Sequence, residues 1–399
     1  MLKSIPRNGI PKFYILIFQF LINIMRIALT GGGTGGHLFP IIAVARELKN
    51  LVQQNVFQIP PGEGATIEFM FIGPPTIGKE ALAEEGISHK TIMAGKLRRY
   101  PSAQNIFDIF KIPLGFLQAL WHLFFFMPNV VFSKGGYGSV PVVLAAWLYH
   151  IPVLIHESDA VPGLANKFCA KFSKRVAISF NEAAKYFKEG KTALTGNPVR
   201  AALFGGSREE AKKIFGLSGA KPVLFIFGGS QGSQALNDVT FESLPALLAR
   251  LEIIHQCGTE NYEMIKQLMP GNFPENYHLL PFLNEEQVRA AYAAADLVVS
   301  RAGASNIAEI AALAKPSILV PLLNAAADHQ NKNASEFAHF GAAIVLEQMN
   351  LTPHLFQNQI FSLLDNPSLL KKMGENAKKF SQPDAAQKIA QEVLNIAKW

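Results

Sequence analysis

His37 directly follows a glycine-rich run at residues 30–36, which itself follows an apolar stretch. Imidazole can remove a proton near neutral pH, and a helix N-terminus lowers the pKa of a histidine and keeps the ring neutral. Glycine lets the backbone turn tightly and approach a ligand closely. We therefore expect His37 to act as a general base, and not only to cap a turn or to pack.

Two further loops carry residues suited to a nucleotide and a sugar. Residues 228–233 are rich in glycine and follow an apolar run, and residues 300–309 repeat the order of strand, loop and helix. Free amides at a helix start favour phosphate groups or a developing anion. The carboxylate of Glu309 could accept two ribose hydroxyls, although a plain surface acid in a first helical turn is also common. The amide of Gln330 suits sugar hydroxyls, or only caps a helix.

Other nucleotide-binding and metal-binding classes fit the sequence poorly. Gly31, Gly33 and Gly36 satisfy the pattern G-x-G-x-x-G, but the second expected strand ends without the acid that holds a ribose in dinucleotide folds. Neither glycine loop ends in Gly-Lys-Ser/Thr, which disfavours a P-loop. His156 and Glu157 are adjacent, but no third ligand follows at the usual spacing, so we expect no metal and no cofactor.

Apolar runs alternate with helical patterns along most of the chain. The runs are mostly continuous, which favours parallel sheets covered on both faces. The pattern breaks near residues 195–200, where we place a linker. The fold class is therefore α/β, with two doubly wound parallel sheets that bind ligands beyond the carboxyl ends of their strands. Strands are expected at residues 26–29, 67–72, 91–93, 130–133, 152–156 and 175–179, and again at 223–227, 252–255, 278–280, 297–300, 317–320 and 343–346.

The composition suits a two-domain globular protein with an anionic partner. The 399 residues are 49 % hydrophobic and 17 % charged, with a net charge of +7 and a pI near 9.2. A chain of this length holds about two domains. The charge favours a nucleotide, a nucleic acid or an acidic lipid surface, or is only a solvated basic surface. Cys169 and Cys257 have no pair spacing, so a reducing cytosol is the natural compartment.

Two apolar segments raise the question of a membrane. Residues 1–24 place basic residues before an apolar run without a small-residue cleavage site, so we rank an overextended start first, a membrane-surface anchor second and a cleaved signal third. Residues 96–126 place Lys96, Arg98 and Arg99 before an aromatic-rich helical stripe that Pro113 interrupts. The stripe is too short and broken to span a bilayer. We expect it to lie at a membrane surface, with part of it packed as a core helix.

Together these motifs resemble the MurG family of bacterial peptidoglycan glycosyltransferases. The resemblance extends from about Met25 to Trp399, and the motifs follow one another in the order of the family. The matching pieces are Gly32-Gly33-Thr34-Gly35-Gly36-His37, Gly135-Gly136-Tyr137, His156-Glu157, Gly163-Leu164-x-Asn166-Lys167, Gly196-Asn197-Pro198-Val199-Arg200, Gly228-Gly229-Ser230-Gln231-Gly232, Arg301-x-Gly303-Ala304, Glu309 and Asp328-His329-Gln330-x-Lys332-Asn333-Ala334.

The resemblance implies a GT-B fold, in which two Rossmann-like domains face a central cleft. The implied domains are an acceptor- and membrane-facing one at residues 25–199 plus 383–399 and a UDP-sugar-binding one at 200–382, while residues 1–24 form an extension. The implied reaction moves N-acetylglucosamine from UDP-GlcNAc to the C4 hydroxyl of the muramyl sugar of lipid I, with inversion and without a metal. The product, lipid II, serves peptidoglycan synthesis, cell shape and cell division.

Position by position, the resemblance implies roles for residues of both domains. His37 is the expected base and Glu157 the runner-up. The donor would contact Thr34, Gly35, Gly36, Arg200, Ser230, Leu283, Ala304, Ser305, Asn306, Glu309 and Gln330. The acceptor would contact Tyr137, Asp159 and Asn166. Asp159 departs from the Asn of many relatives, and it is a further candidate for a share in the base role.

The implied partners are UDP-GlcNAc, lipid I, an anionic membrane surface and other cell-wall synthesis or division proteins, but no nucleic acid. The implied location is the cytoplasmic face of the inner membrane, as a peripheral protein. The alternative function is a UDP-GlcNAc epimerase of GT-B-like fold, which shares the two-domain plan and the UDP pocket but needs no lipid-facing stripe. A non-catalytic lipid- or polyanion-binding protein and a nicotinamide enzyme are further alternatives.

Overall fold

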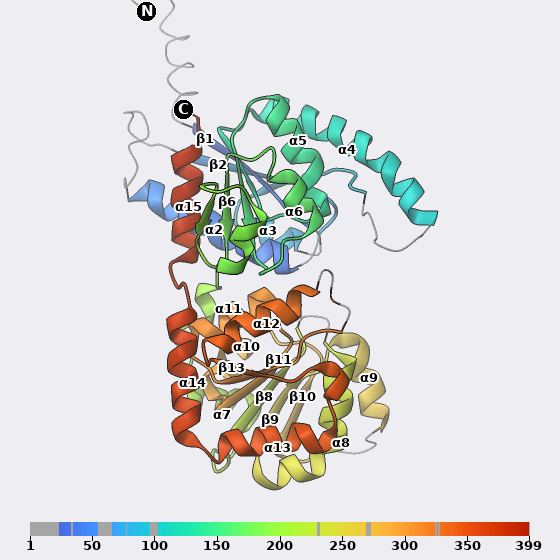
Figure 1. The fold of residues 1–399 in the computed structure, drawn as a ribbon, viewed down its shortest axis with the longest axis vertical. Coiled ribbons are helices and arrows are strands. Elements are labelled where there is room, and N and C mark those ends of the chain that lie inside the picture. The colour runs from blue at the N-terminus through green and yellow to red at the C-terminus, as the bar shows by residue number, and fades with distance from the viewer. Residues whose placement is uncertain are drawn as a thin grey trace, which may run out of the picture. The chain divides into compact units, whose positions relative to one another are not determined.

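Two parallel sheets, each accompanied by helices, form the framework of this computed structural model (Figure 1). The structure describes residues 24–32, 35–54, 66–76, 78–95, 103–229, 232–268, 273–323, 325 and 328–398. The chain divides into two compact units. The first unit comprises the described parts of Met1–His156, Phe168–Val176 and Gln387–Trp399, and the second those of Glu157–Lys167 and Ala177–Ala386.

The first sheet has seven strands in the order β3-β2-β1-β4-β5-β6-β7. The strands are β1 (Ile24–Thr30), β2 (Thr66–Gly73), β3 (Ser88–Thr91), β4 (Val130–Ser133), β5 (Val153–Glu157), β6 (Arg175–Ile178) and β7 (Thr192–Leu194). The helices along this part of the chain are α2 (Gly35–Gln53), α3 (Lys79–Glu84), α4 (Ala103–Phe126), η1 (Tyr137–Ser139), α5 (Val140–Leu148), α6 (Leu164–Cys169) and η2 (Asn181–Tyr186).

The second sheet has six strands in the order β10-β9-β8-β11-β12-β13. The strands are β8 (Val223–Phe227), β9 (Glu252–Gln256), β10 (Tyr277–Leu280), β11 (Leu297–Ser300), β12 (Ser317–Leu319) and β13 (Ala343–Val345). The helices here are η3 (Ala201–Leu203), α7 (Arg208–Phe215), α8 (Gln234–Arg250), α9 (Thr259–Leu268), α10 (Glu285–Ala294), α11 (Ala304–Ala312), α12 (His329–His339), η5 (Gln348–Asn350), α13 (Pro353–Leu364), α14 (Pro367–Phe380) and α15 (Ala385–Ile396).

The loops that follow β1 and β8 leave the sheets at their topological switch points. β1 pairs in parallel with β2 and β4, and β8 pairs in parallel with β9 and β11. Crossovers on the two sides of such a strand lead away in opposite directions, and the crevice at its carboxyl end receives ligands in open α/β sheets. The sheets are therefore doubly wound, as expected, and the two glycine-rich loops begin where such folds bind ligands.

Burial explains which strands could be predicted from the sequence. All residues of β4, β5, β8, β9 and β11 are buried, and each of these strands was expected from an apolar run. The expected third strand at 91–93 is wrong, because β3 lies at Ser88–Thr91, and β7 was not expected at all. Both are edge strands with mostly exposed or half-buried residues, so neither contains the continuous apolar run by which the inner strands were located.

Helix α4 continues through Pro113, although the sequence suggested an interruption there. The part of α4 that follows Pro113 packs against the chain that follows β3. A Cβ atom on Gly115 would lie 1.8 Å from the carbonyl oxygen of Met93, and the Met93 amide donates to Gln118 Oε1 over 2.7 Å. In the part of the chain that the structure describes, no helix combines the length and apolar character needed to cross a membrane.

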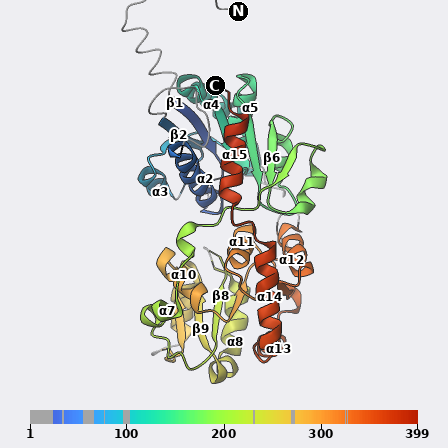
Figure 2. The ribbon, with the colours of Figure 1, turned by 90° about the vertical axis from the view of Figure 1, so that its left-hand side faces the viewer.

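The end of the chain packs into the first unit (Figure 2). Ile389, Ala390 and Val393 of α15 are fully buried. Arg175 Nη1 donates to Glu392 Oε2 over 3.0 Å, and Asn129 Nδ2 donates to the carbonyl of Lys398 over 2.6 Å. The final helix is therefore part of the core of a unit whose sheet lies more than a hundred residues earlier in the sequence.

Candidate active site

His37 lies in the first turn of α2 and packs against glycine backbone. A Cβ atom on Gly32 would lie 2.9 Å from His37 Cδ2, and one on Gly136 would lie 3.3 Å from His37 Cε1. Gly136 also has a φ of +84°, a conformation that residues with a Cβ rarely adopt. The imidazole therefore occupies a place that exists because two loops lack side chains there.

Tyr137 follows that second loop in the same unit. A Cβ atom on Gly138 would lie 2.7 Å from the carbonyl oxygen of Gly31, so the loop after β4 packs directly on the loop after β1. Ser139 Oγ donates to the Gly136 carbonyl over 2.8 Å and fixes the turn. The structure thus brings His37 and the loop of Tyr137 together.

Three candidate donor-binding residues directly precede His37, and the structure describes two of them, Gly35 and Gly36. Gly35 begins α2, and a Cβ atom on Gly36 would have no neighbour within 4 Å among the described residues. Thr34 lies outside the described residues. Open space at Gly36 is compatible with a ligand at the start of this helix.

Glu157 belongs to a buried hydrogen-bond network in the second unit. Its Oε2 accepts from Asn166 Nδ2 over 2.8 Å, and its Oε1 accepts from the amide of Asp159 over 2.9 Å. Asp159 Oδ1 in turn accepts from Asn333 Nδ2 over 2.8 Å, and Asn333 Oδ1 accepts from the amide of Ala160 over 2.8 Å. Asn333, on α12, therefore fixes the segment that carries all three predicted residues Glu157, Asp159 and Asn166.

Helix α11 begins with open space in front of it. Its N-cap residue Gly303 makes no side-chain capping hydrogen bond, and a Cβ atom there would meet no described atom within 4 Å. Ala304, Ser305 and Asn306 form the first turn, and Asn306 Nδ2 donates to Ser300 Oγ over 2.9 Å. Three helix-start amides without a side-chain cap suit a diphosphate.

Glu309, further along α11, carries a buried carboxylate with an ion-pair partner. Arg200 donates to its Oε1 from Nη2 over 2.9 Å and from Nε over 3.3 Å. The Tyr292 hydroxyl donates to its Oε2 over 3.4 Å. Burial raises the pKa of Glu309, while the charge and hydrogen bonds of Arg200 and the hydrogen bond of Tyr292 lower it. The structure thus brings Arg200 and Glu309 together and adds Tyr292, which the sequence did not single out.

Gln330 lies at the start of α12 and holds the loop after β12. The amide of Leu322 donates to Gln330 Oε1 over 2.9 Å. The buried Arg301 donates from Nη1 to the carbonyls of Val320 and Pro321 over 3.1 and 3.2 Å. Burial lowers the pKa of Arg301 to about 10. This loop is therefore tied on two sides near the side chain expected to contact the sugar.

The loop after β8 is positioned by β9. Gln256 Nε2 donates to the Gly229 carbonyl over 3.1 Å, and a Cβ atom on Gly232, at φ +75°, would lie 1.9 Å from the carbonyl oxygen of Cys257. Ser230, the predicted donor contact in this loop, lies outside the described residues. Leu283, expected to border the uracil through its backbone, is buried and belongs to the segment that connects β10 to α10.

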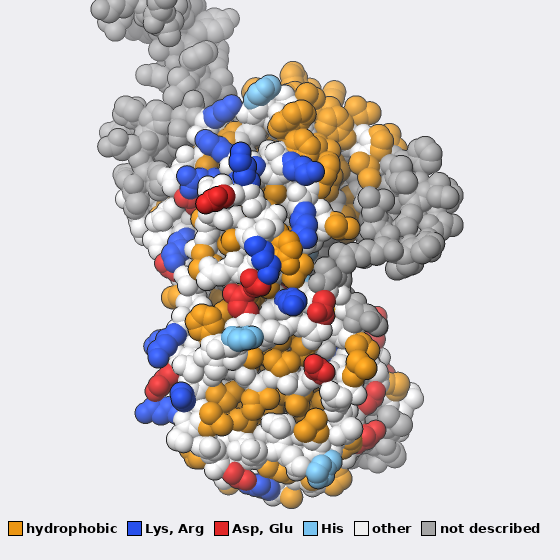
Figure 3. All heavy atoms as spheres, in the orientation of Figure 1, with side chains coloured by type: hydrophobic (Ala, Val, Ile, Leu, Met, Phe, Trp, Pro, Cys, Tyr) orange, Lys and Arg blue, Asp and Glu red, His pale blue; other side chains and the backbone are white. Residues whose placement is uncertain are grey.

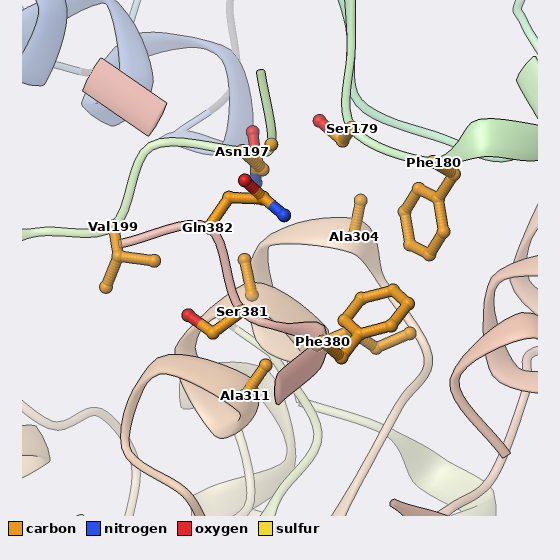
Figure 4. Close-up of a pocket in the computed structure, with 12 residues that line it drawn as sticks. Ser179, Phe180, Asn197, Val199, Ala304, Ala311, Phe380, Ser381 and Gln382 are labelled. Atoms are coloured by element: carbon orange, nitrogen blue, oxygen red, sulfur yellow. The ribbon is translucent and has the colours of Figure 1, made fainter. Parts of the chain in front are cut away.

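A small pocket lies beside α11, which contributes four of its lining residues (Figure 4). It measures 340 Å³ including its open part. Gly196 and Gln382 lie against each other here, because a Cβ on Gly196 would be 2.3 Å from Gln382 Cβ. Its lining is Ser179, Phe180, Gly196, Asn197, Val199, Ala304, Ile307, Ala308, Ala311, Phe380, Ser381 and Gln382, of which only Ala304 is a predicted site residue.

Within the described residues, no three His, Cys, Asp or Glu side chains are grouped closely enough to hold a metal ion. Cys169 and Cys257 are both buried and not joined in a disulfide. Burial raises the pKa of the Cys169 thiol to about 12 and that of Cys257 to about 11. Neither thiol is therefore an activated nucleophile at neutral pH.

Two family models match the chain. The glycosyltransferase family 28 N-terminal domain matches residues 27–178, and the glycosyltransferase family 28 C-terminal domain matches residues 223–389. With the two doubly wound sheets, these matches define the class of the protein as a GT-B glycosyltransferase.

Individual relatives narrow the class to one family. A Clostridium tetani protein named UDP-N-acetylglucosamine--N-acetylmuramyl-(pentapeptide) pyrophosphoryl-undecaprenol N-acetylglucosamine transferase is 39 % identical over 86 % of this chain and 90 % of its own. The crystal structure of Acinetobacter baumannii MurG is 30 % identical, with a TM-score of 0.69 over 93 % of this chain and 99 % of its own. The chain belongs to the MurG family.

A more distant structure shares the fold alone. UDP-GlcNAc 2-epimerase from Neisseria meningitidis, solved with UDP-GlcNAc bound, has a TM-score of 0.65 over 93 % of this chain and all of its own, at 15 % identity. The architecture by itself therefore does not separate a transferase from an epimerase.

Proposed function

We propose that this protein transfers N-acetylglucosamine from UDP-GlcNAc to the C4 hydroxyl of the muramyl sugar of lipid I, and so makes lipid II. The match of 86 % of the chain at 39 % identity to a transferase named for these substrates carries the proposal. We also propose the domain boundaries 25–199 plus 383–399 for the acceptor domain and 200–382 for the donor domain.

The second unit supplies groups suited to the donor. Glu309 would accept the ribose hydroxyls, and the amides of Ala304, Ser305 and Asn306 would bind the diphosphate together with Ser230. Gln330 would contact the sugar, while Arg200 and Leu283 would border the uracil. The ordered start of α11 supports this arrangement, because its amides have no side-chain cap.

The reaction needs a base and a stabilised leaving group. The C4 hydroxyl attacks the anomeric carbon from the face opposite UDP, the bond to the diphosphate breaks, and the configuration inverts. We assign His37 as the group that takes the hydroxyl proton, with Glu157 as the runner-up. The helix-start amides and Arg200 would stabilise the negative charge that grows on UDP.

Glu157, Asp159 and Asn166 would contact the acceptor together with Tyr137. The network described above supports a positioning role for Glu157, because two of its neighbours already donate to its two oxygens. Asp159 accepts from Asn333 in that network, and an Asn at this position could offer an acceptor oxygen as well. We therefore treat the carboxylate of Asp159 as a ligand of Asn333 before any share in the base role.

The acceptor carries a long lipid, so the protein needs a membrane face. Leu117, Trp121, Phe124, Phe125 and Met127 of the α4 region are all at least 60 % exposed, and apolar side chains gather over α4 and α5 (Figure 3). Trp147 and Leu148 at the end of α5 extend this surface. We propose that this α4–α5 surface enters the headgroup region of the cytoplasmic leaflet.

The proposal is tested by incubating the protein with UDP-GlcNAc and a lipid I analogue in the presence of EDTA and measuring UDP release. Release that requires the analogue and persists in chelator supports the proposed transferase. The same incubation without the analogue tests the epimerase alternative, since an isomerised sugar would then form from the donor alone. Absence of UDP release with the analogue would reject the proposed reaction.

A further inference from the structure

The buried hydroxyl of Tyr292 faces the carboxylate that is proposed to bind the ribose. Tyr292 lies on α10 and is only 1 % exposed. Its ring packs edge-on against Phe225, with centroids 5.1 Å apart. Its hydroxyl lies 3.4 Å from Glu309 Oε2. A buried phenol needs an acceptor, and here that acceptor is a residue of the proposed donor site.

The two oxygens of Glu309 have different surroundings. Oε2 receives the Tyr292 hydroxyl from the interior. Oε1 receives the guanidinium of Arg200, whose side chain is 20 % exposed. Arg200 Nη1 also lies 3.9 Å from Glu285 Oε1, at the start of α10. The cation on Oε1 therefore has a second carboxylate within reach, whereas the phenol on Oε2 is held by the core.

We propose that Tyr292 is a positioning residue for ribose recognition: it holds Oε2 of Glu309 in place while the ribose hydroxyls replace Arg200 on Oε1 and the guanidinium moves toward Glu285. The inference rests on the proposed function, because it assumes that Glu309 binds the ribose. Tyr292 does not touch the nucleotide in this scheme and acts only through Glu309.

Physical chemistry favours this division of roles. A buried carboxylate that loses a cation must keep another donor, because an unpartnered buried charge is costly. Tyr292 is the neutral donor that remains. Burial raises the pKa of Tyr292 well above its ordinary value, so the hydroxyl keeps its proton and continues to donate at physiological pH.

The test is Tyr292→Phe, with the dissociation constants of UDP and 2′-deoxy-UDP measured by calorimetry. The wild-type protein should prefer UDP, and the variant should narrow that preference by about three- to tenfold, as expected for one hydrogen bond. Tyr277→Phe is the matched control, since the buried Tyr277 hydroxyl contacts His255 Nδ1 over 2.9 Å in the same unit but not Glu309. This control should lower thermal stability without changing the preference.

Two further variants make the outcomes distinguishable. If wild type and Glu309→Gln show the same preference, Glu309 does not bind the ribose, and both the inference and this part of the proposed donor site fail. If Glu309→Gln abolishes the preference but Tyr292→Phe leaves it intact, Tyr292 only supports the core and the inference alone is overturned.

Glu285→Gln tests the movement of Arg200 separately, and it changes an exposed residue that carries little risk for folding. Loss of this second carboxylate should weaken UDP binding by about two- to fivefold, the range of an exposed ion pair, without changing the preference for UDP over 2′-deoxy-UDP. Unchanged UDP affinity would overturn the exchange of Arg200 between Glu309 and Glu285.

Discussion

His37 is the residue for which the chemistry and the local packing agree most closely. The ring lies in the first turn of α2, and a histidine side chain can act as a general base. Glycine backbone at Gly32 and Gly136 lies directly against the ring. The base role therefore gives a sharp expectation for a single substitution.

His37→Ala should lower kcat by roughly 10²- to 10⁴-fold and leave the affinity for UDP nearly unchanged, because the groups proposed to bind the ribose and the diphosphate belong to the loop after β8 and to α11. Steady-state UDP release and calorimetry measure the two effects. His354→Ala is the control, since His354 is an exposed residue on α13. A variant that loses only donor affinity, or loses little activity, would exclude His37 as the base.

Gly136→Ala should reduce kcat although it leaves the imidazole in place. The new methyl group would lie 3.3 Å from His37 Cε1, on a residue with φ +84°, so either the ring or the loop must shift. Gly190→Ala is a matched control at φ +73° with no atom near the added Cβ, and it should affect stability alone. Equal kcat in both variants would show that the packing of the ring does not matter for turnover.

Binding of UDP-GlcNAc should weaken in mild acid because of Glu309. The raised pKa of this carboxyl means that it gains a proton at a higher pH than an ordinary glutamate, and a protonated acid accepts ribose hydroxyls poorly. Affinity is therefore expected to be full above the raised pKa and to fall as the pH drops through it. Titration calorimetry with UDP-GlcNAc at a series of pH values, from neutral into the acid range, measures this fall in affinity.

The matching variant for that experiment is Glu309→Gln, which carries no titratable group at position 309. Its affinity should be lower than that of wild type and nearly independent of pH in the same range. The charged and titratable neighbours of Glu309 are Arg200, Glu285 and Tyr292. If the affinity of the variant for UDP-GlcNAc falls in acid as much as that of wild type, the titrating group is not Glu309.

The elements that carry several candidate residues could be predicted from the sequence because these residues follow glycine loops. Loops of this kind mark the ends of strands, which predicted the positions of His37, Ala304 and Glu309. Tyr292 and Gln256 could not be found this way, since a buried tyrosine in a helix or a glutamine at a strand end has no local signal. Their importance comes from partners distant in sequence, which only the fold brings together.

At the scale of elements, the inner strands were predictable, whereas the two edge strands of the first sheet, β3 and β7, were not. Strands buried on both faces are mostly continuous apolar runs, whereas β3 contains Ser88, His89 and Lys90. The continuity of α4 was missed for a related reason. A proline inside a helix removes one hydrogen bond and strains the turn before it, and the sequence alone does not show that Gly115 and Gln118 pack on the chain near Met93.

The α4–α5 surface should bind anionic vesicles through its aromatic side chains. Replacing Trp121 and Phe125 together by Ser should weaken binding to phosphatidylglycerol vesicles more than tenfold, since burial of one large apolar side chain contributes about 1.5–3 kcal/mol. Sedimentation with vesicles measures the effect. Turnover of a short-chain, water-soluble lipid I analogue should be unchanged, because neither residue contacts the proposed site.

Met349→Ser is the control for this experiment, since Met349 is 78 % exposed in the second unit and lies outside the α4–α5 surface. Phosphatidylcholine vesicles supply the second control, because basic residues contribute only on an anionic surface. If Met349→Ser weakens vesicle binding as much as the α4 double variant, the membrane face is not specific to α4 and α5.

At the scale of the whole molecule, two units with separate cores should respond differently to the nucleotide. UDP should raise the unfolding temperature of the second unit more than that of the first, because the second unit holds all the described donor residues except those of α2. A ligand at a hundred times its dissociation constant adds about 2.7 kcal/mol to the stability of the state that binds it. Differential scanning calorimetry with and without UDP tests this.

Glu309→Gln should reduce the rise in unfolding temperature that UDP causes in the second unit. The second unit should still unfold in a transition of its own. A single transition that moves as a whole with UDP would mean that the two units unfold together, and the separate response would then be refuted. The second sheet also buries His255, whose pKa burial lowers to about 3. Its contribution to stability is full above the ordinary histidine pKa and is lost as the pH falls below that value, so the scans belong at pH 7 or above.

The return of α15 to the first unit has a consequence for synthesis on the ribosome. Residues 387 onward complete the core of the first unit, and its other segments end at Val176. The first unit therefore cannot complete its core until the ribosome has translated the second unit. At about 5–20 residues per second, that delay is roughly 10–40 s. During this time the surface that α15 later covers is open to chaperones and proteases, and a message cut short near its end yields a protein whose first half never closes.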